Sequence, residues 1–407
     1  MSAAATHERA MSEASLLSPS SLKREVRQRA RILHVVSCLG MGGTEHGLLK
    51  VINGLGHERF EHRICVVRTL DKDFARRMTS VELYEVGSGN AGLQFPLLRL
   101  ASIMKAYRPH VVHTRNFGAL EGIPASRVAG VPVAIHSEHG YELETVAGLP
   151  LRRRVMCRAL FGMADAVFTV TENLRAYHAA QSWTPEQRLR VIYNGVDLET
   201  FTPSRTTAEE TRHRYCIPAD RIVIGSVGRL VPIKNQATLL RAAEMLAENG
   251  CPIHVVLVGD GKEAPALKKQ AAESAALQGR VTFAGTSDRV SDLLSAMDIF
   301  VLPSISEGMS NTILEAMATA LPVVVSRTGG NPELVDEGRS GYLFRPTDPR
   351  SLAGALGRLV QSEELRRGFG ESAREAVVAR FSLSGMIQRY DNLYRELMSV
   401  RNIRVDI

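Results

Sequence analysis

Two glutamates, Glu307 and Glu315, follow an apolar run at residues 299–302 that has the length and composition of a buried strand. The segment that carries them is expected to begin a helix, whose first N–H groups have no partner within the helix and attract phosphates. Gly308 lets a ligand approach the backbone closely, and carboxylates accept hydrogen bonds from sugar hydroxyls. The pair therefore predicts a site for a nucleotide sugar.

Glu315 also has a purely structural interpretation. Residues 312–315 have the spacing of a capping box, in which Glu315 would bond only the N–H of the cap residue, and Glu307 would be a solvated loop acid. A cap does not account for Glu307 and Gly308 directly before it. Ligand binding is therefore the interpretation that we favour.

Arg229 and Lys234 follow a second apolar run, at residues 222–227. Arginine offers a planar fork of donors and lysine a point charge, a combination that suits the separated oxygens of a diphosphate. The alternative is two solvated cations on a loop. Their position at the carboxyl end of a predicted strand, where open α/β sheets bind ligands, favours binding.

Two further candidates follow strands in the first half of the chain. Gly42 and Gly43 come after the strand at residues 32–36 and would let a phosphate approach the backbone, although a plain tight turn is an equal alternative. His139 follows the strand at residues 131–135, where it would donate to a sugar hydroxyl or serve as a structural hydrogen-bonding residue.

Two weaker signals remain, one for contacts with an acceptor and one for a metal site. Arg115 and Asn116 follow residues 111–114 and are our suggestion for contacts with an acceptor. Asp71 and Asp73 match a metal-binding D-x-D, but they lie in a charged loop, and the five scattered cysteines show no zinc spacing. We therefore expect no metal and no other cofactor.

Apolar runs alternate with helical patterns twice along the 407 residues, which predicts two doubly wound parallel-sheet domains of the α/β class facing across a cleft. The predicted units are a polar, disordered tail at residues 1–29, a first domain at 30–205 and a second domain at 206–380. An amphipathic helix within residues 381–407 is expected to pack back on the first domain.

The distribution of charge and the lengths of the apolar runs argue against several classes of protein. The net charge of +7 is not concentrated in one tract, which argues against a nucleic-acid partner and suits an anionic ligand or membrane face. No apolar run reaches the roughly 18 residues that span a bilayer, and residues 1–29 lack the apolar stretch of a secretory signal. A cytoplasmic protein is therefore expected.

Residues 152–158 contain four arginines among apolar neighbours. This stretch predicts either a basic helix that contacts an anionic membrane or a solvated helix face. The first alternative would place the protein peripherally at the inner face of the cell membrane.

Taken in order, the motifs resemble family 4 of the retaining glycosyltransferases, which have the two-domain GT-B fold. The resemblance covers about residues 31–395. Within the family, the chain is similar to the sugar transferases of bacterial exopolysaccharide clusters. It is carried by Gly42 and Gly43, His139 and Gly140, residues 194–197, Gly228 and Arg229, Lys234 and Asn235, residues 258–261, and Glu307 to Glu315.

The resemblance implies roles for these residues. Arg229 and Lys234 would hold the donor diphosphate, Glu307 the transferred sugar and His139 its C6 hydroxyl. The residues implied in donor binding are Gly42, Gly43, Thr286, Gly308, Met309, Ser310, Asn311 and Glu315, with Thr286 at the base and Glu315 at the ribose. The family works without a metal.

The expected function is therefore retaining transfer of a sugar from a nucleotide-sugar donor, UDP-linked by expectation, to a glycan or polyprenyl-linked acceptor in exopolysaccharide or cell-envelope polysaccharide synthesis. Two alternatives stay open. One is a nucleotide-sugar epimerase on the same fold, and the other is a subunit that binds nucleotide sugars without catalysis.

Overall fold

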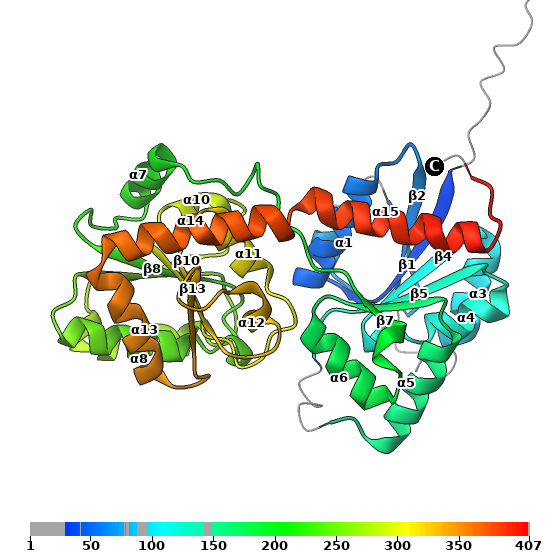
Figure 1. The fold of residues 1–407 in the computed structure, drawn as a ribbon, viewed down its shortest axis with the longest axis horizontal. Helices are drawn as coiled ribbons and strands as arrows, with labels where there is room; N and C mark the ends of the chain where they lie inside the picture. Colours follow the sequence, from blue (N-terminus) through cyan, green and yellow to red (C-terminus); the bar gives the residue numbers. More distant parts are fainter. Residues whose placement is uncertain are drawn as a thin grey trace, which may run out of the picture.

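The computed structural model describes residues 29–40, 42–76, 78, 81–87, 96–141 and 148–405, so the tail predicted at residues 1–29 lies almost wholly outside the described residues. Within the described part, the chain forms one parallel sheet in each of two domains (Figure 1). The expectation of two doubly wound parallel-sheet domains is confirmed.

The sheet of the first domain has the strand order β3-β2-β1-β4-β5-β6-β7. Its strands are β1 (Ala30–Leu39), β2 (Phe60–Leu70), β3 (Glu82–Glu85), β4 (Val111–Arg115), β5 (Val133–Glu138), β6 (Ala166–Thr169) and β7 (Leu189–Val191). Its helices are α1 (Gly43–Leu55), α2 (Lys72–Ala75), α3 (Pro96–Tyr107), α4 (Gly122–Ala129), α5 (Leu151–Met163) and α6 (Glu172–Ser182).

The sheet of the second domain has the order β10-β9-β8-β11-β12-β13. Its strands are β8 (Ile222–Val227), β9 (Ile253–Val258), β10 (Val281–Gly285), β11 (Ile299–Leu302), β12 (Val323–Ser326) and β13 (Gly341–Phe344). Its helices are α7 (Arg205–Arg214), α8 (Gln236–Glu248), α9 (Ala264–Glu273), α10 (Val290–Ser295), α11 (Asn311–Ala318), α12 (Asn331–Leu334), α13 (Pro349–Gln361) and α14 (Glu363–Arg380).

Both sheets reverse their strand order at one point, between β1 and β4 in the first domain and between β8 and β11 in the second. At such a point the connections leave toward opposite faces, which opens a crevice at the carboxyl ends of the strands. Of the strands there, β11 is wholly apolar and buried, and β4 is buried along its whole length although it carries His113, Thr114 and Arg115. The fold therefore dictates where each domain can hold a ligand.

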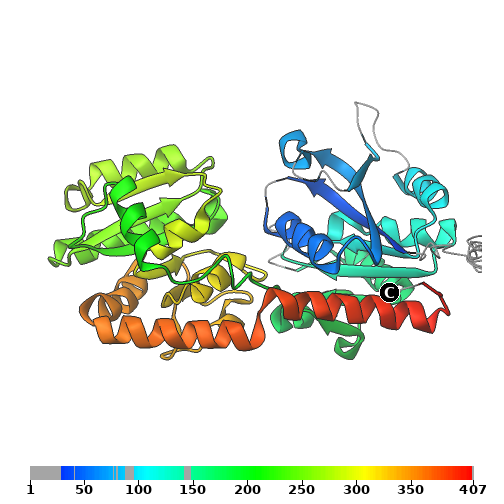
Figure 2. The same ribbon diagram turned by 90° about the horizontal axis from the view of Figure 1, so that it is seen from above.

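The last helix, α15 (Leu383–Val400), lies against the first domain although it follows the second domain in the chain. Its buried face includes Met386, Tyr390 and Tyr394, which pack in one core cluster with Ile32 of β1 and Val133 of β5. Figure 2 shows α14 and α15, in orange and red, running end to end along one side of both domains. Together the two helices bridge the domains.

The chain crosses between the domains at two adjacent points. The N–H of Val196 donates to the carbonyl of Phe381 at 2.9 Å, and the N–H of Leu383 donates to the carbonyl of Val196 at 2.8 Å. A further contact joins α12 to the start of α6, where Glu333 accepts from the N–H groups of Glu172 and Asn173 at 2.9 and 2.7 Å. A second set of hydrogen bonds therefore connects the domains, at α12 and α6.

Gly195 tests how tightly this crossing is packed. A methyl group there would lie 2.7 Å from the Cα of Leu383 and 2.8 Å from the carbonyl oxygen of Ser382. We expect Gly195→Ala to lower the free energy of unfolding by about 1–3 kcal/mol in urea denaturation, because backbone has to move. The control is Gly162→Ala in α5, where nothing lies within 4 Å and the helix gains propensity. Equal midpoints for the two variants would contradict tight packing at the crossing.

Candidate active site

A pocket of about 370 Å³ lies between the domains and is lined by residues of both. From the first domain come the loop after β1, the loop after β5 and Asn194. From the second come the loops after β8 and β11. The pocket brings together the predicted residues Gly42, Gly43, His139, Arg229, Lys234, Glu307, Gly308, Met309, Ser310 and Asn311.

Lys234 and Glu307 form an ion pair in the wall of this pocket. The Nζ of Lys234 lies 2.5 Å from Oε1 of Glu307, and the hydroxyl of Ser304 donates to the same oxygen at 2.5 Å. Both charged side chains are largely buried, with 20 % and 10 % of their surfaces exposed. Lys234 comes from the loop after β8 and Glu307 from the loop after β11. These two strands are neighbours at the switch point of the sheet, which brings the two loops together.

Arg229 extends from the same loop as Lys234 and is exposed. Across the gap lies Glu45 in the first turn of α1, whose pKa is raised by burial and pulled in the opposite direction by the Arg229 guanidinium. The guanidinium thus faces the first domain. It is placed to meet an anionic group bound between the loop and the start of α1.

His139 faces these groups from the first domain. Its backbone N–H donates to Oδ1 of Asn116 at 2.8 Å, and its Nε2 lies 2.9 Å from the Ser137 hydroxyl. Burial, the charge of Arg115 and the neighbouring His136 lower the pKa of His139 to about 3. The imidazole is therefore neutral at pH 7.

Gly308 brings the second domain up to this histidine. A Cβ at residue 308 would lie 2.3 Å from the carbonyl oxygen of His139, so that only glycine permits the approach. The loop after β11 and the loop after β5 therefore touch at the back of the pocket.

Helix α11 begins differently from the capping-box interpretation. Its N-cap is Ser310, whose hydroxyl accepts from the N–H of Ile313, and Thr312 is already inside the helix. The capping box at residues 312–315 is therefore wrong. Glu315 lies in the middle of α11, and the N-terminus of the helix opens toward the pocket.

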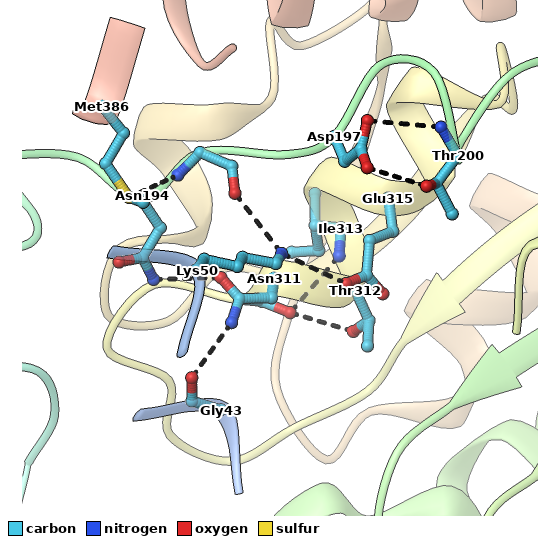
Figure 3. Close-up of polar contacts among 12 residues, drawn as sticks. Gly43, Lys50, Asn194, Asp197, Thr200, Asn311, Thr312, Ile313, Glu315 and Met386 are labelled. Atoms are coloured by element: carbon cyan, nitrogen blue, oxygen red, sulfur yellow. Dashed lines mark hydrogen bonds and ion pairs between the residues drawn. The ribbon is translucent and has the colours of Figure 1, made fainter. Parts of the chain in front are cut away.

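Glu315 does not line this pocket. Its carboxylate faces Lys50 of the first domain (Figure 3). Its Oε1 lies 4.0 Å from the Nζ of Lys50 on α1, and that ammonium also donates to the carbonyl of Gly195 at 3.5 Å. Burial raises the pKa of Glu315 to about 7, with Lys50 acting in the opposite direction.

A second cross-domain contact lies beside this ion pair. The amide of Asn311 donates to the carbonyl of Gly43 at 3.3 Å and accepts from the amide of Asn194 at 3.1 Å (Figure 3). The start of α11 is thereby held against the glycines after β1.

Besides Glu315, three predicted residues lie outside the pocket wall. Arg115 is 2 % exposed and donates to Nδ1 of His34 at 2.9 Å, which argues against direct contact with an acceptor. Asn116 instead orders the backbone of His139. Thr286 is exposed after β10 and does not line this pocket, so its contact with the base stays a prediction.

The D-x-D at Asp71 is a helix cap. The carboxylate of Asp71 accepts from the N–H groups of Asp73 and Phe74 at the start of α2. Within the described residues, no group of three or more His, Cys, Asp or Glu side chains is arranged to hold a metal ion.

Sequence reasoning missed three residues that the structure places at the site. Asn194 and Tyr141 line the pocket, and Lys50 pairs with Glu315. Asn194 belongs to the motif at residues 194–197, which carried a signal for its importance but none for its role. Lys50 gave no signal, because a lysine on an amphipathic helix is usually solvated.

Comparison with known proteins gives the class. The model described as Glycosyltransferase Family 4 matches residues 41–200, and the model described as Glycosyl transferases group 1 matches residues 207–376. The matches coincide with the two domains, and the chain belongs to the group 1 and family 4 glycosyltransferases. The resemblance drawn from the motifs is thereby confirmed.

Individual relatives add detail. The chain is 29 % identical over 307 residues to the UDP-Gal:alpha-D-GlcNAc-diphosphoundecaprenol alpha-1,3-galactosyltransferase of Escherichia coli, covering 74 % of this chain and 79 % of that one. It is 24 % identical over 313 residues to the capsular polysaccharide biosynthesis glycosyltransferase CapM of Staphylococcus aureus, covering 74 % and 80 %.

The fold also matches solved structures. Anabaena Alr3699/HepE, crystallised in complex with UDP, superimposes with a TM-score of 0.77 at 22 % identity over 90 % of this chain and all of that one. Among the described helices, none has the length and apolarity needed to cross a bilayer.

The raised pKa of Glu315 predicts pH-dependent nucleotide binding. The resemblance assigns Glu315 to the ribose, whose hydroxyls donate stronger hydrogen bonds to a charged carboxylate than to a protonated acid. Since the pKa is about 7, UDP affinity should rise between pH 6 and pH 8. Glu315→Gln should bind about tenfold more weakly at pH 8 and lose this part of the rise, as measured by calorimetry. The phosphates of UDP titrate in the same way whether UDP binds the wild-type protein or Glu315→Gln. Parallel pH profiles for the two proteins would therefore contradict the assignment of Glu315 to the ribose.

Proposed function

We propose that the protein transfers a sugar, with retention of configuration, from a nucleoside-diphosphate donor to a glycan or polyprenyl-linked acceptor in bacterial envelope or exopolysaccharide synthesis. One observation carries the proposal. Two cations, Arg229 and Lys234, and the N-terminus of α11 converge on one pocket with Glu307, and His139 faces them from the other domain. This set suits a diphosphate joined to a sugar.

The donor class is supported by both chemistry and relatives. The name of the Escherichia coli relative gives UDP-galactose as its donor and an undecaprenol-linked sugar as its acceptor. We therefore propose a UDP-sugar as the donor and a lipid-linked or free glycan as the acceptor.

Breaking the bond between sugar and diphosphate leaves negative charge on the leaving phosphate. Arg229, Lys234 and the N–H groups at the start of α11 are positioned to stabilise that charge as it forms. We propose that a departing phosphate oxygen takes the proton of an acceptor hydroxyl that attacks from the same face. No carboxylate nucleophile and no metal are then required.

Glu307 has a different role in this scheme. Its carboxylate already holds Lys234 and the hydroxyl of Ser304, which fixes its position. We assign it, together with the backbone after Gly308, to hydroxyls of the transferred sugar. Closure of the two domains around the donor would keep water from the oxocarbenium-like centre.

A panel of nucleotide sugars tests the function. The purified protein should hydrolyse its own donor slowly and transfer faster when a matching acceptor is added, with chromatography of the released nucleotide as the readout. An epimerase would convert a nucleotide sugar with no acceptor present and release no nucleotide. A subunit without catalysis would bind UDP in calorimetry and release nothing from any donor.

Arg229→Ala tests the leaving-group role. Loss of one such donor should lower kcat about a hundredfold or more with UDP-sugars. The control is Arg241→Ala, which removes an exposed arginine from α8 of the same domain. Near-normal turnover in a folded Arg229→Ala protein would remove Arg229 from the mechanism.

We also propose that α5 contacts an anionic membrane, where a lipid-linked acceptor would be found. Leu151, Val155 and Met156 expose 68 %, 54 % and 38 % of their surfaces on this helix, beside the exposed Arg152. No residue of α5 is acidic. An exposed apolar stripe with cationic neighbours suits the headgroup region of a bilayer.

Not all of the arginines on α5 are available for lipid. The guanidinium of Arg154 lies over the Trp183 ring and donates to the carbonyls of Ala180 and Gln181, and Arg153 lies over the ring of Phe117. The basic face predicted over residues 152–158 is thus smaller than the sequence indicated.

Arg152→Glu isolates the membrane contribution. Charge reversal at this position should weaken binding to vesicles that contain phosphatidylglycerol by about tenfold in sedimentation assays. Arg350→Glu, an exposed cation on α13 of the second domain, makes the same change of charge away from α5. An equal loss of binding in both variants would mean that only net charge matters.

A further inference from the structure

A row of buried polar side chains runs behind the pocket, from His139 through the sheet of the first domain to α15. The Ser137 hydroxyl lies 2.9 Å from Nε2 of His139 and 3.0 Å from Nε2 of His113. On the far side, Nδ1 of His113 lies 2.8 Å from the hydroxyl of Tyr394. Ser137, His113 and Tyr394 are fully buried, so solvent does not reach these side chains.

The row begins beside a cation that can only donate. Arg115 is 2 % exposed, and its guanidinium lies beside the hydroxyls of Tyr390 and Tyr394. Burial raises the pKa of the Tyr394 hydroxyl, which therefore keeps its proton at pH 7. A guanidinium offers no acceptor, so Nδ1 of His113 is the acceptor for the O–H of Tyr394, and the positive charge of Arg115 favours the orientation in which the lone pairs of the phenol oxygen face the cation.

That choice determines the next two hydrogen bonds. Burial, followed by the charge of Arg115, lowers the pKa of His113 well below its usual range, so the ring carries one proton. With Nδ1 accepting from Tyr394, the proton of His113 is on Nε2 and is donated to Ser137. Ser137 then has a single O–H to give, and Nε2 of His139 at 2.9 Å is a closer acceptor than the carbonyl of Thr114 at 3.5 Å.

We propose that Tyr394, His113 and Ser137 form a relay of positioning residues that sets the tautomer of His139. Nε2 of His139 accepts from Ser137, so the proton of the neutral ring is on Nδ1, the nitrogen left for a ligand. His139 is then a hydrogen-bond donor to an oxygen of the bound substrate and not a general base. The ligand class is a sugar hydroxyl, which rests on the proposed function.

The same cation orients a second branch. Arg115 donates to Nδ1 of His34, whose Nε2 lies 3.0 Å from Nδ1 of His62. Both histidines have lowered pKa values, first because of burial. Arg115 thus sets the direction of hydrogen bonds on both sides, which explains an arginine in the interior of this domain.

The test is NMR of the full-length protein labelled with ¹⁵N at its 12 histidines, because ring nitrogen shifts report the tautomer directly. His139→Gln assigns the His139 signals. We expect His139 to be protonated on Nδ1 in the wild-type protein at pH 7. Protonation on Nε2 would overturn the proposal, since the relay would then run in the opposite direction.

Two phenylalanine variants separate the relay from packing. Tyr390 and Tyr394 lie one turn apart on α15, both beside Arg115, but only Tyr394 bonds His113. Tyr394→Phe should convert His139 to a mixture of tautomers, whereas Tyr390→Phe should leave it unchanged. Ser137→Ala breaks the relay at its other end and should act like Tyr394→Phe. Unchanged His139 signals in both Tyr394→Phe and Ser137→Ala would overturn the relay.

Kinetics provide a second readout. Tyr394→Phe should lower kcat/KM for the donor about fivefold, the effect of one weakened hydrogen bond, and Tyr390→Phe should change it less than about twofold. If no nucleotide sugar is turned over, the proposed function fails while the NMR result still decides the relay. The two ideas can therefore fail separately.

Discussion

The packing of α15 on the sheet of the first domain is the interaction on which the rest of the structure depends. This helix leaves the second domain at Ser382 and buries Met386, Tyr390 and Tyr394 against strands of the first. It thereby joins the two domains at the edge of the pocket, with Gly195 at the crossing. The same buried face carries a phenol into the hydrogen bonds behind His139, so one helix supports both the shape of the site and its chemistry.

Much of this fold could be predicted from the sequence because its parallel strands are buried on both faces. Residues 299–302 form a continuous apolar run and residues 222–227 are apolar apart from Gly225 and Ser226, and the structure shows strands with those bounds. The strands at Glu82–Glu85 and Gly341–Phe344 were not predicted. They are short edge strands of their sheets, and their apolar stretches are only two or three residues long.

The site could be predicted less completely, for reasons that differ between residues. Ser310 and Thr312 are two hydroxyl residues two positions apart, and only the path of the loop after β11 decides that Ser310 caps α11. Arg115 was assigned to acceptor contacts from its position after residues 111–114, whereas the structure buries it, which is rare for an arginine. Its interior position depends on tyrosines nearly 300 residues later in the chain, whose packing no local pattern indicates.

In the proposed function, the ion pair of Lys234 and Glu307 lies between the two halves of the donor substrate. The two charges neutralise each other at 2.5 Å, in a wall where both are largely buried. A diphosphate that approached Lys234 would compete with Glu307 for the ammonium and release carboxylate lone pairs for sugar hydroxyls. A free phosphate would weaken that pair without supplying the hydroxyls, and a free sugar would leave Lys234 paired. With the roles proposed for Lys234 and Glu307, only a ligand that contains both groups satisfies all partners, and the site would then favour the intact nucleotide sugar over its fragments.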